Sequence, residues 1–210
     1  MKLKLNFGRV LPHRSRREFF AWAIAGLLSV STISAFLPQS LQAQYAPTAT
    51  RQQNPWQYAS FPVENFQAYT SGYGYRSSPV DGSRQFHYGL DLAAPIGSYV
   101  RSWWTGQVVE LSDNTACGTM IKIQSGDWQH VYCHLMGRVQ SDRNTRYLVD
   151  REGGIILQLG QEVPAGARIA RVGMSGRTTG PHLHWGLKYA NNYLDPALVL
   201  QAMFTTQAKL

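Results

Sequence analysis

The sequence predicts an all-β fold, either a β-sandwich or a folded antiparallel sheet, on three observations. The apolar runs after the first forty residues are short, Gly, Pro, Asn and Asp residues separate them at short intervals, and almost no stretch keeps a capped 3.6-residue period. Of the 210 residues, 44% are hydrophobic and 15% are charged. That composition excludes a fully disordered chain, a collagen and a multi-span membrane protein.

Five runs have the length and composition of β-strands. They are Gly106 to Leu111, Met120 to Gln124, His130 to Leu135, Ile155 to Leu159 and Leu183 to Lys188. A helical pattern is found at Pro196 to Met203. The polar stretch from Arg138 to Glu152, closed by two glycines, is interpreted as a solvated surface loop.

The first 43 residues have the features of a helical export signal. Arg16 and Arg17 precede an apolar run from Phe19 to Leu37 that serines and a threonine dilute. Paired arginines before a weakly hydrophobic segment are typical of a twin-arginine signal, with cleavage expected after Ala43. The run is also close to the ~20 residues of a membrane span, so an uncleaved anchor is the alternative. In both cases we expect the rest of the chain in the periplasm or cell envelope, without stable membrane insertion unless the leader is uncleaved.

Composition divides the chain into four segments. The signal of residues 1–43 is followed by a polar linker rich in Pro and Gln at 44–58, a single β domain at 59–203 and a C-terminal tail at 204–210. Six of the 20 Lys and Arg residues lie in the signal, so residues 44–210 have 14 basic and 11 acidic residues. This small excess excludes a phosphate-binding surface, and we predict no nucleic-acid partner.

Two histidines share one face of a predicted strand near the C-terminus. Alternation along Pro181 to Leu187 directs the large apolar side chains to the core and places His182, His184 and Gly186 on the opposite face. Imidazoles two residues apart, about 6.6 Å along a strand, can reach one small volume. The geometry suits the floor of a cleft, and the alternative is a pair of surface histidines.

The predicted strand from His130 to Leu135 contributes another imidazole. The prediction directs Val131, Cys133 and Leu135 to the core and places His130, Tyr132 and His134 on the opposite face. His134 is then a candidate for the same cleft, although a single histidine is more often an ordinary surface or core residue. His130 is interpreted as facing solvent.

A third candidate is the H-x-x-x-D spacing of His87 and Asp91. In an ideal strand these side chains share a face but stand about 13 Å apart, too far to hold one ion. A bend between them is therefore required, and Gly89 permits one. A helix would also bring them close, but Gly89, Pro95 and the aromatic neighbours argue against a helix here.

Together the three segments predict a metal site. Hydrolytic zinc takes three His or Asp/Glu ligands and leaves a fourth position to water. His87, Asp91 and one of His182 and His184 provide such a set. The remaining histidine of that pair and His134 would then lie beside the metal, where general acid and base catalysis needs them. Strand alternation alone does not choose between His182 and His184.

Three motifs occur in a fixed order between about Tyr69 and Pro196. They are SGYGYRSSPVDGSRQFHYGLDLAAPIGSYV, HVYCHL and VGMSGRTTGPHLHW. In these motifs the chain resembles the lysostaphin-type zinc metalloendopeptidase family, which cuts peptide bridges in bacterial cell-wall peptidoglycan. The resemblance implies a compact antiparallel β fold, with the metal at the floor of a groove walled by loops, and it makes residues 59–203 the zinc endopeptidase domain.

The resemblance also assigns roles to the candidate residues. It implies that His87, Asp91 and His184 bind Zn²⁺ and that His134 and His182 are catalytic histidines beside a zinc-bound water, which is the nucleophile. The implied substrate is peptidoglycan, and the export signal favours a D,D-endopeptidase of a Gram-negative envelope.

A rival interpretation is a non-catalytic relative that binds peptidoglycan or activates other wall hydrolases. Such relatives typically lack a metal ligand, whereas all five positions are filled here. A third reading, a structural β module with incidental histidines, predicts that replacing His184 changes neither metal content nor activity.

Cys117 and Cys133 are the two cysteines of the sequence. An even count in an exported chain favours a disulfide, and two buried free thiols are the alternative. Pairing the strands about the turn at residues 125–127 places Cys133 opposite roughly Met120, so the loop from Asn114 to Gly118 must fold back to close the bond. Members of the resembled family usually have a small residue such as Ala at the position of Cys133.

Overall fold

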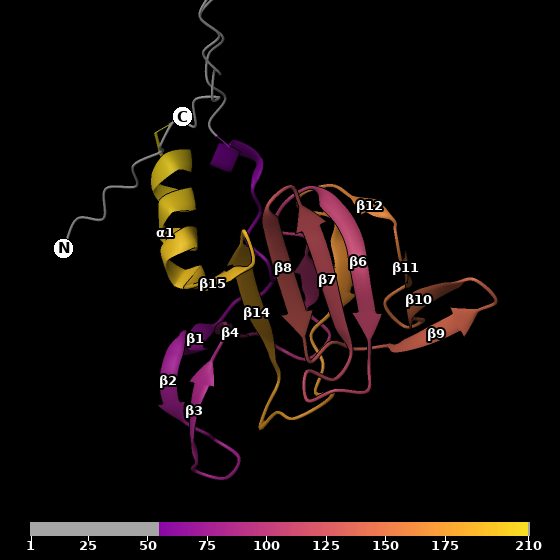
Figure 1. Cartoon of the computed structure of the whole chain (residues 1–210), viewed down its shortest axis with the longest axis horizontal. Coiled ribbons are helices and arrows are strands. Elements are labelled where there is room, and N and C mark those ends of the chain that lie inside the picture. The colour runs from indigo at the N-terminus through magenta and orange to yellow at the C-terminus, as the bar shows by residue number, and fades with distance from the viewer. Residues whose placement is uncertain (1–54, 210) are drawn as a thin grey trace, which may run out of the picture. The chain divides into compact units, whose positions relative to one another are not determined.

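A computed structural model describes residues 55–209 of the chain. The predicted export signal and residues 44–54 of the predicted linker lie outside the described residues. The described part contains fifteen β-strands, one α-helix and the short 3-10 helix η2 (Pro55–Tyr58), and all its strand pairs are antiparallel (Figure 1). The prediction of an antiparallel all-β fold is confirmed. Neither helix in this part of the chain has the length and apolar character that crossing a bilayer requires.

The largest element is an eight-stranded sheet. Its strands are β1 (Ala68–Ser71), β4 (Leu90–Ala93), β6 (Gly106–Ser112), β7 (Met120–Ser125), β8 (Trp128–Cys133), β12 (Glu162–Val163), β14 (His182–Tyr189) and β15 (Asn192–Leu194). They pair in the order β1, β4, β14, β8, β7, β6, β12, and β15 also pairs with β14. Because β14 lies between β4 and β8, the strand with His182 and His184 is flanked by the strand with Asp91 and by the strand that ends just before His134.

Three smaller sheets complete the domain. β2 (Gly74–Ser77) pairs with β3 (Arg84–His87), and β5 (Tyr99–Arg101) pairs with β13 (Arg168–Arg171). The third sheet consists of β9 (Arg138–Asp142), β10 (Thr145–Asp150) and β11 (Ile155–Gln158). In Figure 1 the β2–β3 hairpin and the β9–β11 sheet project from opposite sides of the large sheet.

The core lies on one face of the large sheet. In β14, Leu183, Trp185 and Leu187 are each fully buried, whereas His182 and His184 are only partly buried. The alternation predicted for this strand is therefore confirmed. Burying one such apolar side chain stabilises the fold by about 1.5–3 kcal/mol, so this register is strongly specified.

The prediction of a solvated loop from Arg138 to Glu152 is wrong. These residues form the β9–β10 hairpin, and within β10 Leu148 and Asp150 are buried. The Asp150 carboxylate accepts two hydrogen bonds from Arg171, at 2.6 and 2.7 Å. The polar composition was misleading because the partner that neutralises this charge lies in β13, distant in the sequence.

The prediction that His130 faces solvent is also wrong, because its side chain is fully buried. In the register of β8 and β14, His130 pairs with Leu187 and Tyr132 with Trp185, which places both on the core face. Trp103 N–H donates to Tyr132 Oη at 2.8 Å, and His130 contacts Tyr132 Oη at 2.7 Å. Internal hydrogen bonds thus replace the water that a polar side chain normally requires.

The C-terminal helix α1 (Pro196–Gln207) is longer than the pattern predicts. Asp195 caps it by accepting a hydrogen bond from Ala197 N–H at 2.9 Å, and Pro196 occupies the first turn. The helix continues past the expected end at Met203 into the predicted tail. Gln207 donates a hydrogen bond to Ala59 O at 2.8 Å, and η2, formed by the last residues of the predicted linker, packs on α1.

Candidate metal centre

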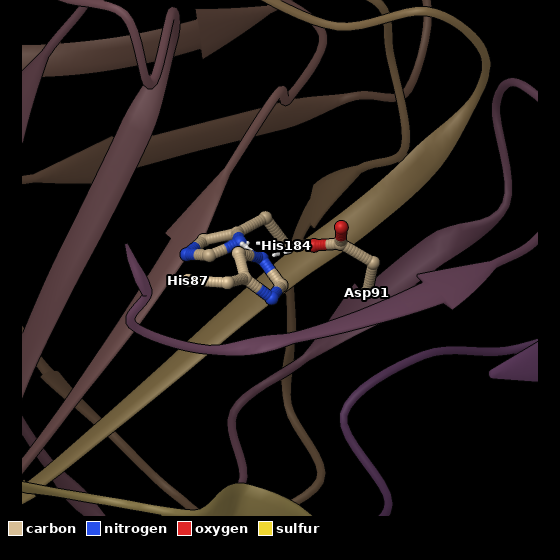
Figure 2. A group of neighbouring side chains, drawn as sticks. All are labelled: His87, Asp91 and His184. Atoms are coloured by element: carbon tan, nitrogen blue, oxygen red, sulfur yellow. Dashed lines mark hydrogen bonds and ion pairs between the residues drawn. The ribbon is translucent and has the colours of Figure 1, made fainter. Parts of the chain in front are cut away.

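Three side chains with metal-ligand chemistry converge where β3, β4 and β14 meet. His87 ends β3, Asp91 lies in β4, and His184 lies in β14 in register with Asp91. His87 Nε2 and His184 Nδ1 are 3.0 and 2.9 Å from Asp91 Oδ1, and 2.9 Å from each other. Figure 2 shows the three side chains directed at one another. The structure thus selects His184, rather than His182, as the third member of the set.

The donor atoms of this set fit a zinc ion. Donors about 2.0–2.1 Å from a tetrahedral zinc are about 3.3 Å apart, so only a small outward shift is needed here. His87 Nδ1–H donates to the carbonyl of Gly72 at 2.7 Å, which leaves Nε2 with a lone pair in the neutral imidazole. That lone pair faces the carboxylate of Asp91. His87 Nε2 and the Asp91 carboxylate are then both acceptors, and a cation bound between them would satisfy both.

The bend that the H-x-x-x-D spacing requires is present at Gly89. β3 ends at His87 and β4 begins at Leu90. A Cβ atom at Gly89 would stand 2.7 Å from both His184 Cε1 and Trp185 O, closer than real Cβ contacts. Any larger residue would push the backbone away from β14 and separate the three donors.

The charges of the site are set by burial and by the donors themselves. Burial opposes ionisation of Asp91, but the imidazoles of His184 and His87 outweigh it and hold the pKa of this carboxyl well below its usual range. Burial lowers the pKa of His184, while Asp91 acts in the opposite direction. An ionised carboxylate beside a neutral imidazole is the protonation state that metal binding requires.

Two further histidines flank this set. His182 Nδ1 contacts Gly180 O at 2.9 Å, and its Nε2 lies 3.6 Å from Asp91 Oδ1. His134 Nδ1 contacts Ser175 O at 2.9 Å, and the ring centroids of His134 and His182 are 4.8 Å apart. Because a carbonyl only accepts, both Nδ1 atoms carry the hydrogen. Burial lowers the pKa of His134 to about 4, so Nε2 of this residue is an acceptor at neutral pH.

His134 reaches the groove by a reversal of the backbone. The register places Cys133 opposite His184, on the metal side of the sheet, so alternation would direct the next residue to the core. His134 instead adopts a left-handed conformation with φ 61°, which turns its side chain back to the metal side. The predicted position beside the metal set is correct, but the predicted reason, a shared face with His130 and Tyr132, is wrong.

The histidines and Asp91 lie in a groove of about 390 Å³. Arg76 and Val80 of the β2–β3 hairpin and Arg177 and Thr178 of the loop before β14 also line the groove, and Arg177 forms an ion pair with Asp81 of the hairpin at 2.6 Å. Sequence reasoning did not single out these four lining residues. The first and last motifs contain both arginines, but nothing in their spacing shows that they face the same groove.

The Cys117–Cys133 disulfide is formed, with Cα atoms 5.0 Å apart, and both residues line the groove. The loop before β7 folds back as the prediction requires. His134 N–H donates to Cys117 O at 2.8 Å, which fixes this loop against the end of β8.

Residues 85–196 match peptidase family M23, and the chain belongs to that family. The match contains all five residues of the site and spans more than half of the chain. The predicted resemblance to lysostaphin-type peptidases is confirmed, since lysostaphin of Staphylococcus staphylolyticus is 32% identical over 120 residues, which are 56% of this chain and 22% of lysostaphin.

A curated relative and a solved structure from Vibrio cholerae are also similar. The peptidoglycan DD-endopeptidase ShyB is 34% identical over 138 residues, which are 64% of this chain and 28% of ShyB. The crystal structure of a zinc-containing peptidase superimposes with a TM-score of 0.53 at 30% identity, over 66% of this chain and 38% of that one. The chain therefore spans well under half the length of these relatives.

Proposed function

We propose that this protein is a zinc-dependent endopeptidase that hydrolyses peptide cross-links in bacterial peptidoglycan. His87, Asp91 and His184 are the zinc ligands, and His134 and His182 are the catalytic histidines. The observation that carries the proposal is the pairing of a three-donor metal set with two imidazoles whose Nδ1–H groups are already bonded to backbone carbonyls. In a structural zinc site, protein ligands fill all four coordination positions. Two further imidazoles oriented beside the metal are not a feature of such a site.

The two flanking histidines are prepared for proton transfer. Each ring is oriented by its Nδ1 hydrogen bond, which leaves Nε2 available to the groove. When bound, zinc supplies a Lewis acid that acidifies a water molecule and polarises the scissile carbonyl. Nε2 of the pair accepts the proton lost by the attacking water, and a proton passes from the pair to the amine nitrogen as the C–N bond breaks.

The substrate class follows from family membership and from the relatives. ShyB is named a peptidoglycan DD-endopeptidase, and lysostaphin belongs to the same family. A D,D-endopeptidase acting on cross-links also agrees with the twin-arginine pattern of Arg16 and Arg17, which would carry the chain to the periplasm or cell envelope. An open groove, rather than an enclosed pocket, suits a polymer that must be bound along its length.

Digestion of purified cross-linked sacculi tests the proposal. Residues 44–210 should convert cross-linked muropeptide dimers to monomers, as read by mass spectrometry. His184→Ala should lose both zinc and activity, because it removes a ligand. His134→Ala should keep about one zinc per chain and lose activity by roughly 10²–10⁴-fold, the usual contribution of a general acid or base.

The rival functions give different results in the same assay. A non-catalytic relative would bind sacculi but release no products from wild type. Equal digestion by wild type and His184→Ala would exclude the zinc mechanism. Unchanged zinc content in His184→Ala would show that the metal, if bound, is held elsewhere.

A further inference from the structure

The Cys117–Cys133 disulfide ends on the residue next to a catalytic candidate. Cys133 immediately precedes His134, and the other half of the bond, Cys117, accepts a hydrogen bond from His134 N–H at 2.8 Å. The disulfide and this hydrogen bond both join the loop before β7 to the backbone at the end of β8. The disulfide is therefore within the groove, not on a distant surface, and both sulfur-bearing residues line it.

The conformation of His134 depends on these neighbours. A non-glycine residue in the left-handed region is strained, and it persists only where the surrounding structure fixes it. His134 has φ 61°, and both of its backbone polar groups are used: N–H donates to Cys117 O and the carbonyl accepts from Gly173 N–H at 2.9 Å. Without the reversal, its side chain would point to the core side of the sheet.

The loop tied by Cys117 also positions the acceptor of the His134 imidazole. Arg177 N–H donates to Ala116 O at 2.8 Å, and Thr119 N–H donates to Ser175 Oγ at 2.9 Å. A Cβ atom at Gly118 would lie 2.3 Å from the carbonyl carbon of Ser175, so the two loops are in close backbone contact. Ser175 O is the group that accepts from His134 Nδ1–H.

We propose that the Cys117–Cys133 disulfide is a positioning element of the active site, which holds His134 in the reversed conformation so that only the oxidised protein hydrolyses its substrate efficiently. This inference rests on the proposed function. The relevant chemistry is thiol–disulfide exchange: two cysteine thiols react with one disulfide of a small molecule or protein, which leaves as two thiols. A chain that is reduced in the cytoplasm would then gain full activity after export.

Two forms of the purified protein that lack the bond test the proposal. One is Cys117→Ala/Cys133→Ala, and the other is wild type reduced with a phosphine. Reoxidation of the reduced wild type with oxidised glutathione is the reversal control. We expect kcat on sacculi to fall by about tenfold or more in both, with KM and zinc content nearly unchanged, because the ligands lie on other strands. Reoxidation should restore wild type, and the double variant should not respond to reductant.

A spectroscopic readout separates positioning from simple stabilisation. The imidazole NMR signals of His134, assigned by comparison with His134→Ala, should report the Nδ1–H tautomer in oxidised protein and lose that signature without the bond. Val199→Ala, a core variant in α1 outside the groove, is the control: it should lower Tm but keep kcat and the His134 signals well below the transition.

The outcomes decide between the alternatives. If both disulfide-free forms fold, keep wild-type kcat and keep the His134 signature, the proposal is overturned and the bond is merely stabilising. If the double variant does not fold, the reduced wild type, checked by circular dichroism, gives the same two readouts. If wild type itself hydrolyses nothing, the proposed function fails, and the His134 signals still decide whether the disulfide positions this residue.

Discussion

At the scale of single residues, the site depends on contacts around Asp91. Its Oδ1 faces His87 Nε2 and His184 Nδ1, at 3.0 and 2.9 Å, while Oδ2 lies 3.5 Å from the guanidinium of Arg76. Arg76 Nε is buried and has no hydrogen-bond partner among the described residues. A partly buried cation beside the second carboxylate oxygen favours coordination through Oδ1 alone, since partners of this kind orient metal ligands.

We therefore predict that Arg76→Met weakens zinc affinity. Residues that contact metal ligands without binding the metal typically contribute about 10–100-fold to metal affinity, and we expect a loss of zinc affinity in this range. Arg76→Lys, which keeps the charge, should recover part of it. Competition titration with a chelator measures both, and an affinity equal to wild type in Arg76→Met would refute the role.

Gly89 gives a second prediction at this scale. Gly89→Ala places a methyl group 2.7 Å from both His184 Cε1 and Trp185 O, so the strands must separate. We expect destabilisation of about 1–3 kcal/mol, typical of overpacking, together with a lower zinc affinity. Gly72→Ala is the control, because a Cβ there meets nothing within 4 Å. Denaturant titration and zinc titration of the two variants should differ clearly; similar results would mean that the bend tolerates a side chain.

At the scale of elements, a buried ion pair links the β9–β10 hairpin to β13. Arg171 of β13 donates two hydrogen bonds to Asp150 of β10, and the side chains are 13% and 4% exposed. The hydrogen bonds from Arg171 lower the pKa of Asp150. Glu152 contacts the same arginine at 3.4 Å but is 80% exposed. We therefore expect Asp150, and not Glu152, to contribute to the free energy of unfolding.

The corresponding prediction compares two neutralising variants. Asp150→Asn leaves the charge of Arg171 buried without its partner, so we expect a loss of about 3 kcal/mol of unfolding free energy. Glu152→Gln should change it by less than about 0.5 kcal/mol, as for an exposed pair. Urea denaturation followed by tryptophan fluorescence measures both values. Equal effects would show that the hairpin is held by other contacts.

At the scale of the whole molecule, the buried His130 links stability to pH. Burial lowers its pKa to about 3, whereas an unfolded histidine titrates near 6.5. Between these values the unfolded state binds more protons than the folded state, so the unfolding free energy rises with pH. The slope from this residue is up to about 1.4 kcal/mol per pH unit, and the contribution is lost as pH falls from about 6.5 towards 3.

We expect the slope to decrease in His130→Gln, which cannot take up a proton. The measurement is the unfolding free energy of both proteins between pH 4 and 7; the difference in slope is independent of the absolute stability that the variant loses. Parallel lines for the two proteins would contradict the assignment of this pH dependence to His130.

The sequence by itself determined the β class, the core face of β14 and the five residues of the candidate site. Strand alternation brings His182 and His184 to one face, and the family resemblance implies that His184 is the ligand and His182 its neighbour. These are local properties, because a period of two and a bend at Gly89 depend on adjacent residues.

Only the tertiary structure decided which polar residues are buried and how His134 reaches the groove. His130 and Asp150 are buried because Tyr132 Oη and Arg171 satisfy them, and Arg171 comes from a distant strand. His134 lies beside the metal set because its backbone reverses at φ 61°. Burial of a polar group and strain of a backbone angle both depend on partners that only the folded chain brings together, so neither follows from local sequence patterns.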